Sequence, residues 1–343
     1  MTAHPRQPRI VLFGLGGTIA MAPVAGGGVA PALSPSDLVA AVPGLAESGI
    51  AVEVVDFRRL PGASLDFADV HALSVAVDGA FAAGADGVVV AQGTDTLEET
   101  AYLLDLWHAG PRPVVVTGAM RNPTAAGHDG PANLLAALRV AADPGVAGLG
   151  VLVVLADEIH PARRVRKTHS TSVGAFTSPN GGPLGYLVGG RPCVLHRPEG
   201  RFVLPRPADP PTARVGLVTV TLGDRGELLH GAEDRLDGLV VAGMGVGHVP
   251  ERLVGRLHEI GGRIPVVLAS RTGAGPVLTD TYAFPGSERD LLARGLVPAG
   301  FCDPVRARLL LCAALAAGAD RATVAGAFAA AGGYTAPDSW PWA

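Results

Sequence analysis

The chain almost lacks lysine. Of its 27 basic side chains one is Lys167, and the other 26 are arginines. Arginine keeps its proton under all conditions in which proteins fold, whereas a partly buried lysine can lose its proton and act as a base. Lys167 is therefore either a chance survivor in an arginine-biased sequence or an amine that the chemistry of the protein needs.

Cysteine is scarce as well. Cys193, Cys302 and Cys312 are too few and too scattered for a disulfide framework or a zinc ribbon. We expect them to be buried small hydrophobic residues in a reducing compartment. The ten histidines are dispersed, and no HExxH or paired-cysteine spacing occurs. We therefore expect no metal site.

Nucleotide and cofactor motifs are also missing. Two glycine pairs begin like a dinucleotide fingerprint, but Ile19 and His248 occupy the position of the third glycine. Neither a GxxxxGK phosphate loop nor a GxSxG nucleophile elbow is present. The sequence therefore predicts no cofactor.

Charge and long apolar runs are limited too. Charged residues make up 17% of the 343 residues, hydrophobic residues make up 48%, and the net charge is −4. The hydrophobic content allows a large core. The net negative charge does not indicate the basic surface that nucleic-acid binding requires. No apolar run has the length of a membrane span or the form of a signal peptide, so we expect a cytoplasmic protein without a membrane partner.

What the chain does contain is a regular alternation of short β-branched runs and helical patterns. In the first 155 residues we predict strands at 10–14, 50–57, 87–91, 113–117 and 150–155, and helices at 35–42, 67–83, 97–108 and 130–142. After residue 214 we predict strands at 215–220, 238–242 and 264–269, and helices at 250–260, 288–294, 304–317 and 320–330. Such alternation indicates an α/β fold with parallel sheets covered on both faces.

Two α/β domains are expected, a larger N-terminal one with a parallel sheet (residues 1–196) and a smaller C-terminal one (214–343). Residues 197–213 between them are rich in proline and form the predicted linker. Residues 21–31 lack periodicity and contain three consecutive glycines, which favours a mobile loop or lid. Residues 163–176 lack a helical stripe and are predicted to leave the sheet as an extended or hairpin segment, while 181–186 continue as turns.

Hydroxyl and carboxyl side chains gather at two predicted strand ends. Thr94 and Asp95 follow the strand at 87–91, and Thr18 follows the first strand. Open α/β sheets bind ligands at the carboxyl ends of their strands. Thr94 or Asp95 could instead merely cap the next helix, with Glu98 or Glu99 completing a capping box. Together with Lys167, these residues provide the side chains that a threonine nucleophile activated by a base requires.

The sequence resembles the bacterial-type L-asparaginases and glutaminase-asparaginases over essentially its whole length. The resemblance is carried by Gly16-Gly17-Thr18-Ile19-Ala20, Gly93-Thr94-Asp95-Thr96-Leu97-Glu98-Glu99-Thr100, Gly118-Ala119-Met120-Arg121, Asp129-Gly130-Pro131 and Lys167-Thr168. It implies hydrolysis of a side-chain amide through an acyl-threonine, and a homotetramer built from tight dimers.

Site residues follow from the resemblance position by position. Thr18 matches the nucleophile, and Thr94, Asp95 and Lys167 match the second threonine with its carboxylate and amine. Ser64 and Asp95 match groups that hold the α-carboxylate and α-amine of the substrate. Ala119 matches a backbone position near the departing amide.

The sequence departs from the family pattern in two places. Many relatives have a tyrosine in the lid, but the four tyrosines here are Tyr102, Tyr186, Tyr282 and Tyr334, and none lies between residues 18 and 31. His248 falls where many relatives have an asparagine that reaches a neighbouring subunit. Tyr282 and Glu288 lie near the expected place of a further glutamate, and neither is a clear match.

These observations predict an enzyme that converts L-asparagine to L-aspartate and ammonia. One methylene changes discrimination by only about 1 to 3 kcal/mol, so a glutaminase-asparaginase of broader specificity remains an alternative. An ammonia-supplying subunit of a tRNA-dependent amidotransferase is another. A third is a non-catalytic amino-acid sensor on the same scaffold, because a fold alone does not fix function.

Overall fold

The structure is a computed structural model that describes residues 6–17, 19, 21–23, 29–31 and 34–343. Its contacts divide the chain into two compact units, Met1–Pro198 (unit 1) and Glu199–Ala343 (unit 2). The boundary falls within the residues predicted as a linker, and the domain limits themselves stay a prediction. Each unit is considered by itself.

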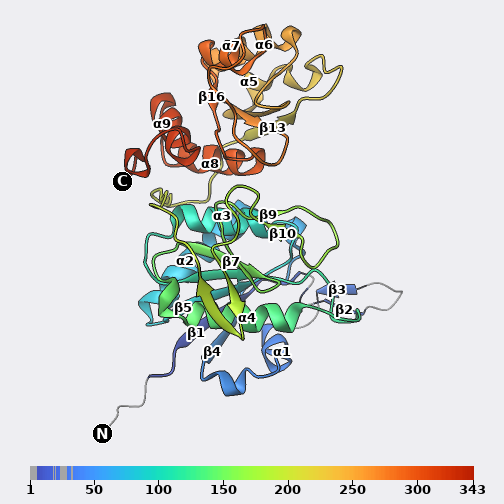
Figure 1. Ribbon diagram of the computed structural model, residues 1–343, viewed down its shortest axis with the longest axis vertical. Helices are drawn as coiled ribbons and strands as arrows, with labels where there is room; N and C mark the ends of the chain where they lie inside the picture. Colours follow the sequence, from blue (N-terminus) through green and yellow to red (C-terminus); the bar gives the residue numbers. More distant parts are fainter. Residues whose placement is uncertain (1–5, 18, 20, 24–28, 32–33) are drawn as a thin grey trace. The chain divides into compact units, whose positions relative to one another are not determined.

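Unit 1 contains an eight-stranded sheet in the order β12-β11-β8-β7-β6-β5-β1-β4 (Figure 1). Five of its strands are parallel and match the predicted ones: β1 (Arg9–Gly14), β4 (Ala51–Asp56), β5 (Gly87–Ala91), β6 (Val114–Thr117) and β7 (Val151–Leu155). Three antiparallel strands extend one edge: β8 (Glu158–Pro161), β11 (Gly185–Val188) and β12 (Arg191–Val194). The predicted α/β class is confirmed, but the sheet is mixed and not purely parallel.

The helices of unit 1 cover both faces of this sheet, as Figure 1 shows for α3 and α4. They are α1 (Pro35–Ala40), α2 (Phe67–Ala82), α3 (Leu97–Trp107) and α4 (Gly130–Ala142). Ser34 begins α1 with a capping box, and Asp66 does the same for α2. One core joins α1 and α4 to alternate strand residues such as Leu12, Val89 and Leu152, all of them fully buried.

Two short antiparallel pairs lie outside the main sheet. β9 (Arg166–Lys167) pairs with β10 (Phe176–Thr177), which confirms the predicted hairpin over residues 163–176. β2 (Met21–Pro23) pairs with β3 (Val29–Pro31) inside the segment predicted as an aperiodic loop. Residues 24–28 of that predicted lid lie outside the described residues.

Unit 2 has a four-stranded parallel sheet in the order β13-β14-β15-β16. The strands are β13 (Val215–Thr219), β14 (Gly238–Gly243), β15 (Val266–Ser270) and β16 (Val297–Pro298). The helices are α5 (Ala232–Arg235), α6 (Glu251–Arg263), α7 (Glu288–Ala293), α8 (Pro304–Ala316) and α9 (Arg321–Ala331). Three strands and four helices were predicted here. The very short β16 and α5 were not, because they are too short for a periodic signal.

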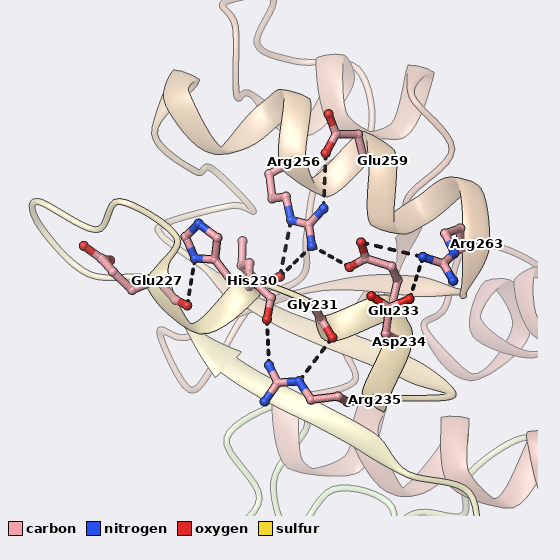
Figure 2. Close-up of polar contacts among 10 residues, drawn as sticks. Glu227, His230, Gly231, Glu233, Asp234, Arg235, Arg256, Glu259 and Arg263 are labelled. Atoms are coloured by element: carbon pink, nitrogen blue, oxygen red, sulfur yellow. Dashed lines mark hydrogen bonds and ion pairs between the residues drawn. The ribbon is translucent and has the colours of Figure 1, made fainter.

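A network of ion pairs fastens α5 to α6 (Figure 2). Arg256 lies between Glu233 at 2.5 Å and Glu259 at 3.2 Å, and it donates to the backbone oxygen of Leu229 at 3.0 Å. The pKa of Glu233 is lowered by a hydrogen bond from its own backbone N–H, and further by Arg256. Within the described residues, no helix is long and apolar enough to cross a membrane.

Candidate active site

The carboxyl ends of β1 and β5 approach each other so closely that only glycine fits between them. Gly17 has a φ of +84°, and a Cβ atom there would lie 2.1 Å from the Cα of Gly93. On the other side, a Cβ on Gly93 would lie 3.0 Å from the backbone nitrogen of Gly62. The residues next to Thr18 and Thr94 therefore meet at one edge of the sheet, as the position of the two motifs predicts.

Three of the four predicted catalytic side chains are in direct contact. The Lys167 Nζ atom donates to Thr94 Oγ1 at 2.9 Å and to Asp95 Oδ1 at 3.0 Å. Thr94 is buried, with 4% of its surface exposed, whereas the side chains of Lys167 and Asp95 are 17% and 63% exposed. We call Thr94, Asp95 and Lys167 the relay cluster. It combines a buried hydroxyl, an amine and a solvent-facing carboxylate.

The capping interpretation of these residues is wrong. The residue that precedes α3 is Thr96, and its side chain makes no capping hydrogen bond. Its Oγ1 donates instead to the backbone oxygen of Gly62 at 2.8 Å, which ties the β5–α3 turn to the short helix Gly62–Ser64. No capping box is found at the start of α3, and Glu98 Oε2 accepts a hydrogen bond from the backbone N–H of Lys167 at 2.8 Å.

Of the other predicted site residues, Ser64 and Ala119 are described by the structure, whereas Thr18 is not. Thr18 lies outside the described residues, and its neighbours Gly17 and Ile19 are buried. Ser64 is exposed at the end of the helix Gly62–Ser64. Ala119 is buried after β6, with 1% of its surface exposed.

The loop that contains Ala119 is held by two side chains that sequence reasoning assigned no role at the site. Asp129 accepts hydrogen bonds from the backbone N–H groups of Met120 (3.0 Å) and Arg121 (2.8 Å). Asn133 Nδ2 donates to Asp129 and to the backbone oxygen of Gly118, both at 3.0 Å. Asp129 directly precedes α4, but its carboxylate makes no capping hydrogen bond.

His248, Tyr282 and Glu288 form a separate cluster in unit 2. The His248 Nε2 atom lies 3.2 Å from Glu288 Oε2, and the rings of His248 and Tyr282 meet edge to face at 4.9 Å. Burial favours the neutral carboxyl of Glu288, but hydrogen bonds from the backbone N–H groups of Tyr282 and Thr281 outweigh it and lower its pKa. In the part of the chain that the structure describes, no group of three metal-ligating side chains is found.

Comparison with known proteins identifies the class to which this fold and site belong. A family model described as asparaginase, N-terminal, matches residues 9–199, and one described as glutaminase/asparaginase C-terminal domain matches residues 214–328. The chain therefore belongs to the asparaginase family.

Individual relatives cover nearly the whole chain. A probable L-asparaginase of Deinococcus radiodurans is 39% identical over 92% of this chain and 95% of its own length. An L-asparaginase of Bacillus licheniformis is 31% identical over 90% and 95%. The crystal structure of a probable cytoplasmic L-asparaginase from Campylobacter jejuni superposes with a TM-score of 0.81 at 30% identity, covering 94% of this chain and 99% of that one.

Proposed function

We propose that the protein hydrolyses L-asparagine to L-aspartate and ammonia through an acyl-threonine intermediate. The observation that carries the proposal is the contact of the Lys167 amine with both Thr94 and Asp95, at the strand end that faces the loop after β1. Family membership over both units and the names of the full-length relatives support the same reaction.

In this mechanism the Thr18 hydroxyl attacks the side-chain amide carbon of asparagine. Its proton passes through Thr94 and Lys167 as the new C–O bond forms, and backbone N–H groups at the glycine-rich strand ends stabilise the oxyanion. The C–N bond then breaks, and the nitrogen takes up a proton and leaves as ammonia. Water hydrolyses the ester, which releases aspartate and restores the Thr18 hydroxyl.

Substrate orientation depends on two charged groups of asparagine. Asp95 is the predicted partner of the α-amine, and its side chain is exposed enough to accept a second hydrogen bond besides that from Lys167. Ser64 is the predicted partner of the α-carboxylate. Ala119 places its backbone near the departing amide, on a loop held by Asp129.

Two variants test this assignment through ammonia release from asparagine. Thr94→Val keeps the shape of a buried side chain but removes the oxygen that accepts from Lys167, so we expect kcat to fall about 100- to 10,000-fold. Thr18→Ala removes the proposed nucleophile and is expected to abolish turnover. Thr171→Val, at an exposed position of the segment between β9 and β10, is the control. Wild-type ammonia release by both Thr94→Val and Thr18→Ala would refute the mechanism.

Glutamine is the alternative substrate and calls for the same assay. Two Pseudomonas relatives named glutaminase-asparaginase are 32% and 33% identical to this chain over 67% of its length. Comparing kcat/KM for asparagine and glutamine decides the preference. Binding of asparagine in a calorimeter without ammonia release would instead indicate a sensor.

We also propose that the protein is a cytoplasmic homotetramer. The tetramer follows from the family resemblance, and the location is supported by the likeness to the Campylobacter jejuni protein, which is described as a probable cytoplasmic L-asparaginase. Light scattering coupled to gel filtration measures the mass of the assembly. Fractionation of cells that express the natural gene tests the location, and a periplasmic protein, such as the name of the Haemophilus influenzae relative indicates, would contradict it.

A further inference from the structure

We infer that Glu98 is a positioning residue for Lys167. Its carboxylate holds the backbone of Lys167, and so the amine, in place against Thr94. The inference rests on the proposed function, and it concerns a residue to which the mechanism above gives no role.

Among the described residues, the strand that carries Lys167 has β10 on one edge and no partner strand on the other. Residues 166–167 pair with 176–177, and the backbone N–H of Thr168 donates to Ala175 on the paired side at 2.7 Å. Neighbouring residues in a strand direct their N–H groups to opposite edges, so the N–H of Lys167 faces away from β10. Glu98 Oε2 accepts that N–H at 2.8 Å, which takes the place of a strand on the second edge.

Glu98 also lies on the segment that the amine must reach. Thr94 lies in the turn between β5 and α3, and Glu98 belongs to the first turn of α3, four residues later. The same short segment therefore contacts Lys167 at both ends, through Thr94 Oγ1 and Asp95 Oδ1 at the end of the side chain and through Glu98 Oε2 at the backbone. These contacts fix both ends of a flexible four-carbon side chain, so the position of Nζ is set by geometry and not by the charge of Glu98.

Two substitutions distinguish the length of the Glu98 side chain from its charge. Glu98→Gln loses the charge but keeps an oxygen at the same distance from the backbone, whereas Glu98→Asp keeps the charge but withdraws the oxygen by about 1.5 Å. We expect Glu98→Asp to lower kcat for asparagine about 10- to 100-fold, because misplacement of a catalytic group by an ångström costs this much. Glu98→Gln should stay within about threefold of the wild-type kcat, and KM should change little in both.

Glu251→Gln is the matched control, since Glu251 is an exposed carboxylate in the first turn of α6 in unit 2. The pH profile of kcat provides a second readout, because a positioning role leaves its shape unchanged in Glu98→Gln. Wild-type kcat in Glu98→Asp would overturn the inference, and so would a loss in Glu98→Gln as large as that in Glu98→Asp. Absence of ammonia release by the wild type would instead refute the proposed function, so the two failures are distinguishable.

Discussion

A buried histidine makes the stability of unit 1 depend on pH. His160 on β8 is fully buried, with its Nδ1 atom 3.0 Å from Ser178 Oγ. Glu158 Oε2 lies 3.1 Å from Nε2 but outside hydrogen-bond geometry. Burial disfavours the charged imidazolium and lowers the pKa of His160 from 6.5 to about 4. Burial also raises the pKa of the Glu158 carboxyl.

The sign and size of the effect follow from these values. In the unfolded chain His160 takes up a proton as the pH falls through 6.5, while the folded protein resists protonation down to a pH of about 4. Since the unfolded state binds more protons, the free energy of unfolding falls as the pH falls through this window. Between pH 7 and pH 5 the loss from His160 is about 2 kcal/mol. Glu158 acts in the opposite direction near its own pKa, because burial raises the pKa of its carboxyl in the folded state.

The assay compares the wild type with His160→Asn, whose amide can still meet the Ser178 hydroxyl. Urea unfolding at pH 7 and pH 5 is followed by the fluorescence of Trp107, a buried indole of unit 1, in a background where Trp340 and Trp342 are phenylalanine. The wild type should lose about 2 kcal/mol more than His160→Asn between the two pH values.

An exposed histidine of the same unit provides the control for this experiment. His128→Asn should keep the pH dependence of the wild type, because His128 is exposed. Equal losses in the wild type and His160→Asn would refute the idea that His160 is held neutral by burial.

Three further changes have defined outcomes. Gly17→Ala places a Cβ at a φ of +84°, against the backbone of Gly93. It should lower the free energy of unfolding by at least about 1 to 2 kcal/mol and lower the melting temperature. An unchanged melting temperature would contradict the close approach of the two strand ends. Asp303→Ala removes the buried carboxylate that pairs with Arg306 and caps α8. Urea unfolding should show that the free energy of unfolding falls by about 3 to 5 kcal/mol. A fall below about 1 kcal/mol would indicate that the pair behaves like an exposed ion pair. Arg256→Met removes a partner that lowers the pKa of Glu233, so the melting temperature of the variant should lie below that of the wild type at neutral pH. The difference between the two melting temperatures should narrow as the pH falls below about 4.5. A difference independent of pH would exclude the Glu233–Arg256 pair as its cause.

The sequence was sufficient for the parts of the fold that depend on long apolar runs. Residues 87–91 are five consecutive buried positions, and the short length and β-branched composition of this run predict a buried strand. The predicted start of the first helix at residue 35 also agrees with the structure, where Ser34 and Asp37 cap α1. By contrast, the residues of β11 and β12 are mostly half-buried or exposed, and the two strands contain Gly185 and Pro192, which look like turn residues. Their strand character comes from the pairing of β11 with β8 and of β12 with β11.

The relay cluster could be predicted because chemistry, and not periodicity, distinguishes its members. Lys167 is 73 positions from Thr94, and no local pattern connects them, but the scarcity of lysine singled out one amine and the hairpin prediction gave it a route to the strand ends. The contact of Thr94, Asp95 and Lys167 agrees with that expectation, whereas the catalytic roles, above all that of Thr18, stay predictions.

The supports of the relay cluster and of the loop that contains Ala119 could not be predicted, and the reason is physical. Glu98, Asp129 and Asn133 act on backbone groups, and a backbone N–H or C=O looks the same in every residue type. Nothing in the sequence tells which N–H lacks a strand partner until the sheet is assembled. Both residues of β9 are charged, so the hydrophobic pattern that predicted the long strands does not identify β9. The backbone of Lys167 is held by a hydrogen bond to the side chain of Glu98, a residue that sequence patterns assign to helix capping.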